Sequence, residues 1–182
     1  MSAPIGAVPP AVKLEAWVRG MSSPQRISLA DHRGKWVVLV FYPRDFTFVC
    51  PTELQSLASL QREFESEDAV VLAASTDSYH SHKAWYEGDL RLHAVTFPVL
   101  ADTAHQLARA FGVLLDDGTA LRGTFILDPW GVVRHVLVND LDVGRNIEET
   151  LRTLRALKTG ELCPVSWAPG EPTLSGSEDA AA

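Results

Sequence analysis

WVVLVFYP, residues 36–43, is a continuous apolar run closed by a proline. A run this rich in β-branched residues is typical of a central strand that is buried on both faces. Pro43 has no N–H for a strand ladder, so the strand ends there in a loop that reaches Val49. After the loop, leucines recur at helical spacing, which predicts a helix over residues 51–63. Cys50 is therefore expected at a helix N-terminus, close behind a buried strand.

Extended and helical segments alternate along the rest of the chain. Extended segments are predicted over residues 13–18, 26–29, 69–74, 97–100, 123–127 and 132–138, and helices over residues 78–87, 105–111 and 146–158. Strands alternating with helices, then a strand pair and a closing helix, indicate a layered α/β domain. We expect one domain over residues 1–174. The small and acidic composition of residues 175–182 predicts a disordered tail.

Charge and hydropathy exclude several kinds of partner. The chain has 182 residues and a net charge of −7, so it has no electrostatic attraction for nucleic acid or anionic lipid. Its longest apolar run ends at Tyr42 and is far shorter than the about 20 residues that a membrane helix needs. The N-terminus shows neither the basic start nor the apolar segment of a secretory signal. We therefore expect a cytoplasmic protein with no membrane partner.

The chain has two cysteines, Cys50 and Cys163. A reducing cytosol disfavours permanent disulfides, so such a pair is more often catalytic, redox-sensing or free. The sequence has no Cys-x-x-Cys pair and no histidine spacing typical of zinc sites. We therefore expect no metal.

Cys50 has the surroundings of a reactive thiol. Cysteine attacks as the thiolate, which a helix N-terminus and a nearby cation both favour. Thr47 stands three residues earlier, so one turn of chain would bring its hydroxyl near the sulfur. Pro43 begins this turn and would shield one side of the pocket from water.

The cation has three candidates, Arg44, Arg122 and Arg145. Arg122 is preferred because it precedes a predicted strand that would hold it, whereas Arg44 stands in a loop. The residues alone leave a second interpretation open, since an isolated cysteine is often a small, inert, buried side chain. That interpretation applies equally to Cys50 and Cys163.

A resemblance to a known family decides between these interpretations. Residues 41–54, FYPRDFTFVCPTEL, resemble the peroxidatic signature of the peroxiredoxins, whose core is Pro-x-x-x-Thr-x-x-Cys. Residues 121–129, LRGTFILDP, resemble the strand that carries the family's active-site arginine. Residues 161–167, ELCPVSW, resemble the resolving-cysteine motif. The resemblance covers about residues 12–174 and points to the typical two-cysteine class, close to the peroxidase component of the alkyl hydroperoxide reductases.

The resemblance implies a thioredoxin-like fold with a central mixed β-sheet flanked by helices. It implies a peroxidase in which Cys50 reduces hydrogen peroxide or an organic hydroperoxide and becomes a sulfenic acid. Cys163 of the partner subunit would then close a disulfide, which an external dithiol reduces. Thr47 and Arg122 would activate Cys50 and hold the peroxide, and Pro43 would shield it. No metal or organic cofactor is implied.

Glu53 and Arg145 match positions that support the site in such proteins, as an ion pair that orients the arginine. A plain surface salt bridge is the alternative. The implied partners are a thioredoxin-like protein or a flavoprotein disulfide reductase, together with a second copy of the chain. The family forms homodimers and often closes five of them into a decameric ring, and its members serve antioxidant defence and redox homeostasis.

The chain departs from the family pattern in three places. Residues 88–96 contain no Gly-Gly-Leu-Gly segment, which predicts resistance of Cys50 to overoxidation. The link from Leu157 to Cys163 is shorter than is common, which would restrict the reach of the resolving cysteine. Arg44 stands where many relatives have a small or apolar residue, and we expect its side chain to be solvated.

Three other functions are alternatives to a peroxidase. A thioredoxin-type disulfide oxidoreductase normally needs a Cys-x-x-Cys pair, which this sequence lacks. A chaperone role would survive the loss of Cys50. A redox sensor or relay would use the same cysteine chemistry, with another protein as its partner in electron transfer.

Overall fold

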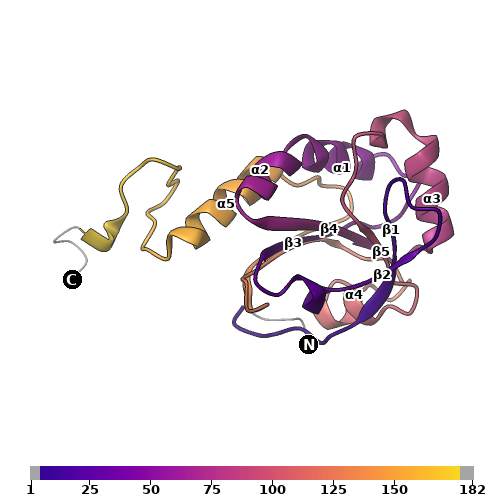
Figure 1. Cartoon of the computed structure of the whole chain (residues 1–182), viewed down its shortest axis with the longest axis horizontal. Coiled ribbons are helices and arrows are strands. Elements are labelled where there is room, and N and C mark those ends of the chain that lie inside the picture. Colours follow the sequence, from indigo (N-terminus) through magenta and orange to yellow (C-terminus); the bar gives the residue numbers. More distant parts are fainter. Residues whose placement is uncertain (1–4, 177–182) are drawn as a thin grey trace. The chain divides into compact units, whose positions relative to one another are not determined.

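The computed structural model describes residues 5–176 (Figure 1). These residues divide into two units, residues 5–145 and residues 146–176. The predicted tail begins inside a short 3-10 helix, η3 (Leu174–Gly176), and its other residues, 177–182, lie outside the described part. The tail and the single domain over residues 1–174 therefore stay predictions. No helix among the described residues is long and apolar enough to cross a membrane.

The first unit is built on one mixed sheet. Its strands are β1 (Lys13–Trp17), β2 (Gln25–Ser28), β3 (Trp36–Phe41), β4 (Ala69–Ser75), β5 (Val99–Ala101), β6 (Arg122–Leu127) and β7 (Val133–Asn139). Their order is β2-β1-β5-β4-β3-β6-β7. β3 and β5 run parallel to β4, and the other pairs are antiparallel. The predicted mixed sheet with flanking helices is confirmed.

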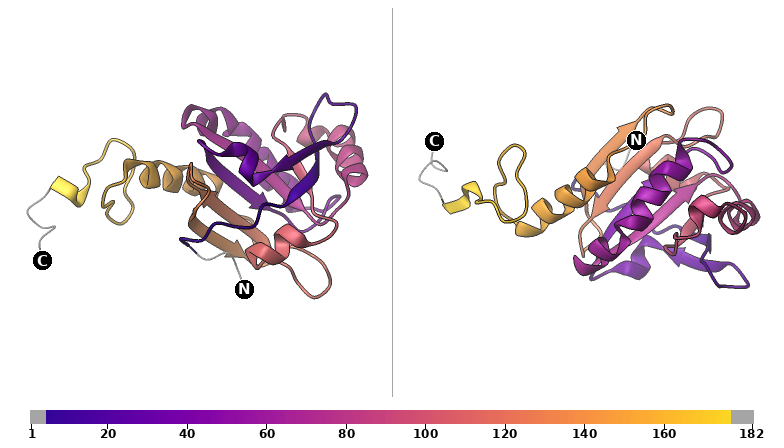
Figure 2. Two further views of the ribbon diagram at one scale, coloured as in Figure 1. Left: turned by 60° about the horizontal axis from the view of Figure 1, so that its bottom comes forward. Right: turned by 90° about the horizontal axis from the view of Figure 1, so that it is seen from above.

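The helices of this unit lie on both sides of the sheet (Figures 1 and 2). They are α1 (Cys50–Ser59), α2 (Gln61–Ser66), α3 (Tyr79–Gly88) and α4 (Gln106–Phe111), with the 3-10 helices η1 (Leu29–His32) and η2 (Leu90–Leu92). The single helix predicted over residues 51–63 is wrong in one respect. The backbone of Leu60 leaves helical geometry at φ −97° and ψ 3°, which ends α1 and starts α2.

β3 is the central strand that the apolar run predicts. It lies between β4 and β6, and every residue from Val37 to Phe41 is buried. Val37, Leu39 and Phe41 pack with Leu107 and Phe111 of α4 in one cluster. Side chains alternate across a strand, so the intervening residues face the other side, where α1 and α2 lie (Figure 1). Burial on both faces explains why the run is apolar at every position.

Gly123 in β6 has no room for a side chain. A methyl group there would lie 2.8 Å from Phe125 Cε2 and 2.8 Å from Val113 Cγ1, and both neighbours are fully buried. We expect Gly123→Ala to lower the free energy of unfolding by about 1–3 kcal/mol, because an overpacked core cannot relax without strain. Urea unfolding measures the effect. Gly88→Ala is the matched control, since nothing lies within 4 Å of its added methyl group. Equal stability of both variants would contradict the prediction.

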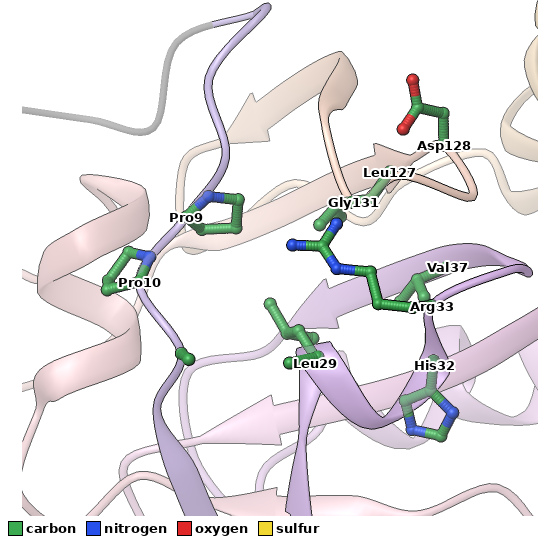
Figure 3. A pocket seen from close by; sticks show the side chains of 11 residues that line it. Pro9, Pro10, Leu29, His32, Arg33, Val37, Leu127, Asp128 and Gly131 are labelled. Atoms are coloured by element: carbon green, nitrogen blue, oxygen red, sulfur yellow. The ribbon is translucent and has the colours of Figure 1, made fainter.

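A crevice elsewhere in this unit is not the predicted active site. Pro9, Pro10, Leu29 and Leu127 help to line it, and none of the candidate catalytic residues does (Figure 3). The Arg33 side chain extends over Gly131, where a methyl group would lie 1.6 Å from Arg33 Nη1.

The second unit begins with α5 (Ile147–Thr159), capped by the Asn146 side chain, which accepts from the backbone N–H of Glu149 at 3.0 Å. Gly160, in the left-handed conformation at φ 68°, ends the helix. The following segment folds back on itself, because the N–H of Leu174 donates to the carbonyl of Leu162 at 2.8 Å.

Candidate active site

Cys50 is the first residue of α1, as predicted from the sequence, and its side chain is fully buried. Pro51 follows in the first turn, where its missing N–H costs no helical hydrogen bond. The preceding residue, Val49, offers no side-chain cap to the helix N-terminus. The chain therefore presents a buried thiol at the positive end of a helix dipole.

Arg122, the first residue of β6, contacts this thiol. Its Nη1 donates to Cys50 Sγ at 3.4 Å and to Glu53 Oε2 at 2.7 Å, and its Nε donates to the carbonyl of Leu141 at 2.7 Å. The guanidinium is thus held by a strand and by two oxygen acceptors. Of the three arginines considered from the sequence, the structure brings Arg122 to the sulfur. Arg145 binds Glu53 instead.

The Glu53 carboxylate accepts hydrogen bonds from both Arg122 and Arg145. Its Oε1 accepts from the backbone N–H and the Nε of Arg145, each at 2.8 Å, and its Oε2 accepts from Arg145 Nη2 at 3.0 Å. Arg145 Nη1 also donates to the carbonyl of Gly123 at 2.7 Å. Glu53 is 4% exposed and Arg145 is 8% exposed. The pair is therefore a buried, multiply bonded cluster, and the surface salt bridge considered as the alternative is wrong.

The two guanidinium groups set the protonation of Glu53. Burial alone would raise the pKa of this carboxyl group, but the hydrogen bonds and charge of Arg145 and the charge of Arg122 outweigh it. The pKa of Glu53 therefore lies below its ordinary value of 4.5. Two positive charges face one carboxylate at the Cys50 thiol.

This depressed pKa predicts how stability changes in acid. The folded chain binds the Glu53 proton less readily than the unfolded chain, so Glu53 stabilises the fold fully above about pH 4.5. The contribution is lost as the pH falls through the folded-state pKa. We expect Glu53→Gln to be less stable than the wild type at pH 7, with a difference that narrows below pH 4.5. Urea unfolding across this range measures it, and a difference independent of pH would contradict the assignment.

Thr47 and Pro43 lie in the loop between β3 and α1. Pro43 is buried, and Thr47 is half-buried. The Thr47 hydroxyl donates to the carbonyl of Arg44 at 2.9 Å, which uses its one proton. Its oxygen is therefore left as an acceptor, and in this arrangement the hydroxyl does not donate to the Cys50 sulfur.

A buried polar network below this loop was missed from the sequence. Asp45 Oδ1 accepts from the Tyr42 hydroxyl at 2.7 Å, and Asp45 Oδ2 lies 2.9 Å from His82 Nδ1. The N–H of Asp45 donates to Asp77 Oδ2 at 2.8 Å. Burial, followed by the nearby Tyr86 and Asp45, raises the pKa of Tyr42 well above its ordinary value. The sequence signal for this network was Asp45, a charged residue that stands between the aromatic residues Tyr42 and Phe46.

Comparison with known proteins identifies the family. Residues 5–136 match the model of the AhpC/TSA family. The chain is 48% identical to a peroxiredoxin of Caenorhabditis elegans over 178 residues, which are 93% of this chain and 88% of the relative. The chain belongs to the AhpC/TSA family. It is also 44% identical to a thioredoxin peroxidase of Echinococcus granulosus, over 97% of this chain and 95% of that protein.

Solved structures agree with this assignment. The reduced 2-Cys peroxiredoxin of Plasmodium vivax matches with a TM-score of 0.90 at 34% identity, over 96% of this chain and 94% of that one. Mycobacterium tuberculosis AhpC matches with a TM-score of 0.80 at 39% identity, over 87% and 99%. The predicted thioredoxin-like fold and the resemblance to typical two-cysteine peroxiredoxins are confirmed, so the chain is a thiol-dependent peroxidase.

In this peroxiredoxin, Cys163 follows α5 in the second unit and is half-buried. Its Sγ lies 3.5 Å from Thr159 Oγ1 and 3.8 Å from the carbonyl oxygen of Ala156. Both Cys50 and Cys163 are free thiols in this structure. Within residues 5–176, no group of three or more histidine, cysteine, aspartate or glutamate side chains could hold a metal ion.

Proposed function

We propose that Cys50 is the peroxidatic residue of this enzyme and that it reduces hydrogen peroxide and organic hydroperoxides. The contact of Arg122 Nη1 with Cys50 Sγ at 3.4 Å carries this proposal. Arg122 and Arg145 share the single carboxylate of Glu53, so the buried cluster has one uncompensated positive charge. A thiolate at Cys50 would complete the charge balance, which favours the nucleophilic form.

In the first step, the thiolate attacks the terminal peroxide oxygen. The S–O bond forms as the O–O bond breaks, so sulfur is oxidised to the sulfenic acid and the peroxide is reduced. The leaving oxygen takes up a proton and departs as water or an alcohol. Arg122 stabilises the charge that develops on the two oxygens. Thr47 Oγ1 accepts from the peroxide O–H, because its own proton is bound to the carbonyl of Arg44. Pro43 shields the sulfur.

In the second step, the thiolate of Cys163 from a partner subunit attacks the Cys50 sulfenic sulfur. The S–S bond forms as the S–O bond breaks, and the departing hydroxide takes up the proton that the Cys163 thiol released, so that water leaves. Cys50 is fully buried, so the start of α1 must open before the second sulfur can reach it. A thioredoxin-type dithiol then reduces the disulfide by exchange. Relatives named thioredoxin peroxidase and thioredoxin-dependent peroxide reductase support this donor over a flavoprotein.

The partner role of Cys163 implies a homodimer at least. We infer that five dimers close into a ring and that the enzyme works in the cytoplasm, in antioxidant defence. Sedimentation of the reduced and the oxidised protein separates a dimer from a ring of ten subunits.

Mixing two inactive variants tests the proposed pairing. In a mixed dimer of Cys50→Ser and Cys163→Ser subunits, one Cys50 meets the Cys163 of the other subunit. We expect one equivalent of hydrogen peroxide to produce a covalent dimer whose peptide map contains a Cys50–Cys163 link between an isotope-labelled and an unlabelled chain. Pairing within one chain would give no such peptide. Failure of thioredoxin to reverse the wild-type disulfide would instead favour a sensor over a recycled peroxidase.

A further inference from the structure

Arg44 binds a turn that lies far from it in the sequence. Its Nη2 and Nε both donate to Thr119 Oγ1, at 2.6 Å and 3.1 Å, and its Nη2 lies 3.8 Å from Asp117 Oδ2. Thr119 is only 4% exposed, whereas the Arg44 side chain is 52% exposed, so the hydrogen bonds lie at the edge of the buried region. Arg44 is therefore exposed, as expected, but its guanidinium is also hydrogen-bonded to a buried hydroxyl group.

The turn that receives Arg44 is held by its own hydrogen bonds. The N–H of Leu115 donates to the carbonyl of Thr119 at 2.8 Å, and the N–H of Gly118 donates to the carbonyl of Leu115 at 3.0 Å. The N–H of Thr119 donates to Asp117 Oδ1 at 2.8 Å. Arg122 follows shortly afterwards, at the start of β6. Arg44 thus connects the loop before Cys50 to the segment that delivers Arg122.

The backbone of Arg44 also makes a hydrogen bond within the loop that precedes Cys50. Its carbonyl accepts from the Thr47 hydroxyl at 2.9 Å. Between these two residues, Phe46 is held at φ +57°, a left-handed conformation that is strained for a bulky side chain. Such a conformation persists only where neighbouring contacts hold it, and the contacts of Arg44 and Asp45 do so here. Loss of the Arg44 anchor would release part of that constraint.

We propose that Arg44, through Thr119, is a positioning residue that holds the loop in the conformation that reacts with peroxide. The same anchor opposes the opening that exposes Cys50 to Cys163. This inference rests on the proposed function and deepens it. It requires opposite effects on the two chemical steps, because the first step needs the closed loop and the second needs it open.

The test uses Arg44→Met and Thr119→Val in the full-length enzyme, each of which removes one side of the contact and keeps similar bulk. Rapid quenching with mass spectrometry follows the sulfenic acid and the disulfide separately. We expect sulfenic acid formation to slow by about three- to tenfold and disulfide formation to accelerate by a similar factor. At high peroxide, less Cys50 should reach the sulfinic acid, because faster resolution competes with the second oxidation.

Matched variants distinguish the loss of this contact from a general disturbance of the fold. Thr119→Ser keeps the hydroxyl oxygen and should retain wild-type rates for both steps. Asp117→Asn should also stay close to the wild type, since its amide oxygen can still accept from the Thr119 N–H and the lost 3.8 Å ion pair joins two largely exposed side chains. The double variant of Arg44→Met and Thr119→Val should equal either single variant, because both changes remove one interaction.

The outcomes are distinguishable. Two unchanged rates in Arg44→Met, or a parallel fall of both rates, would overturn the positioning role. Additive effects in the double variant would show that Arg44 does not act through Thr119. If the wild type forms no sulfenic acid at Cys50, the proposed function itself is wrong, and the inference falls with it.

Discussion

Replacement of Cys50 by serine is expected to lower kcat/KM for hydrogen peroxide by at least about 10³. A serine hydroxyl stays protonated at neutral pH and attacks a peroxide oxygen poorly, whereas a thiolate is both charged and polarisable. The oxygen can still accept from Arg122, so the buried cluster with Glu53 should keep its hydrogen bonds. Peroxide consumption coupled to a thioredoxin-type donor measures the loss, and urea unfolding shows whether the fold is retained.

Cys163→Ser is the matched control for this loss. Its Cys50 should consume one equivalent of peroxide at the wild-type rate and then stop, because the sulfenic acid has no resolving thiol. A single-turnover measurement separates the two variants. Peroxide consumption by Cys50→Ser at the wild-type rate would contradict the assignment of the nucleophile, whatever the effect of Cys163→Ser.

The local half of the site could be predicted from the sequence. An apolar run, a proline and a helical leucine pattern place Cys50 at the start of a helix, because each signal acts within a few residues. The same kind of reasoning favours Arg122 over Arg44, since a predicted strand follows Arg122. The structure places Arg122 against Cys50, with 72 positions between them along the chain.

The contacts between residues that are far apart in the sequence could not be predicted in this way. Glu53 and Arg145 are 92 positions apart, and periodicity does not reveal which charges meet in a buried cluster. Arg44 and Thr119 are 75 positions apart, and a loop arginine is ordinarily solvated. Only the family resemblance suggests the Glu53 pair, while nothing in the sequence suggests Thr119. The topology of the sheet determines both of these contacts between residues that are distant in the sequence.

Removal of the Arg122 guanidinium is expected to have the second largest effect. Arg122→Met should lower kcat/KM for peroxide by about 10²–10³, which is typical for the loss of one hydrogen-bond donor to a charged transition state. Methionine fills a similar volume but leaves Glu53 with Arg145 alone. The buried charges then balance without a Cys50 thiolate. Both the nucleophile and the stabilisation of the leaving oxygen are thus weakened.

Arg122→Lys separates these two contributions. Lysine keeps the positive charge, but its ammonium cannot donate in the planar arrangement that reaches Cys50, Glu53 and the carbonyl of Leu141 together. If charge alone matters, Arg122→Lys should react with peroxide almost as fast as the wild type. If geometry matters, as the three contacts of Arg122 indicate, its rate should fall close to that of Arg122→Met.

The alkylation rate of Cys50 at neutral pH supplies an independent measurement, because it depends on the fraction of Cys50 present as thiolate and involves no peroxide. A variant with normal alkylation and slow peroxide reduction would place the role of Arg122 in the transition state, whereas equal losses in both would place it in the formation of the thiolate.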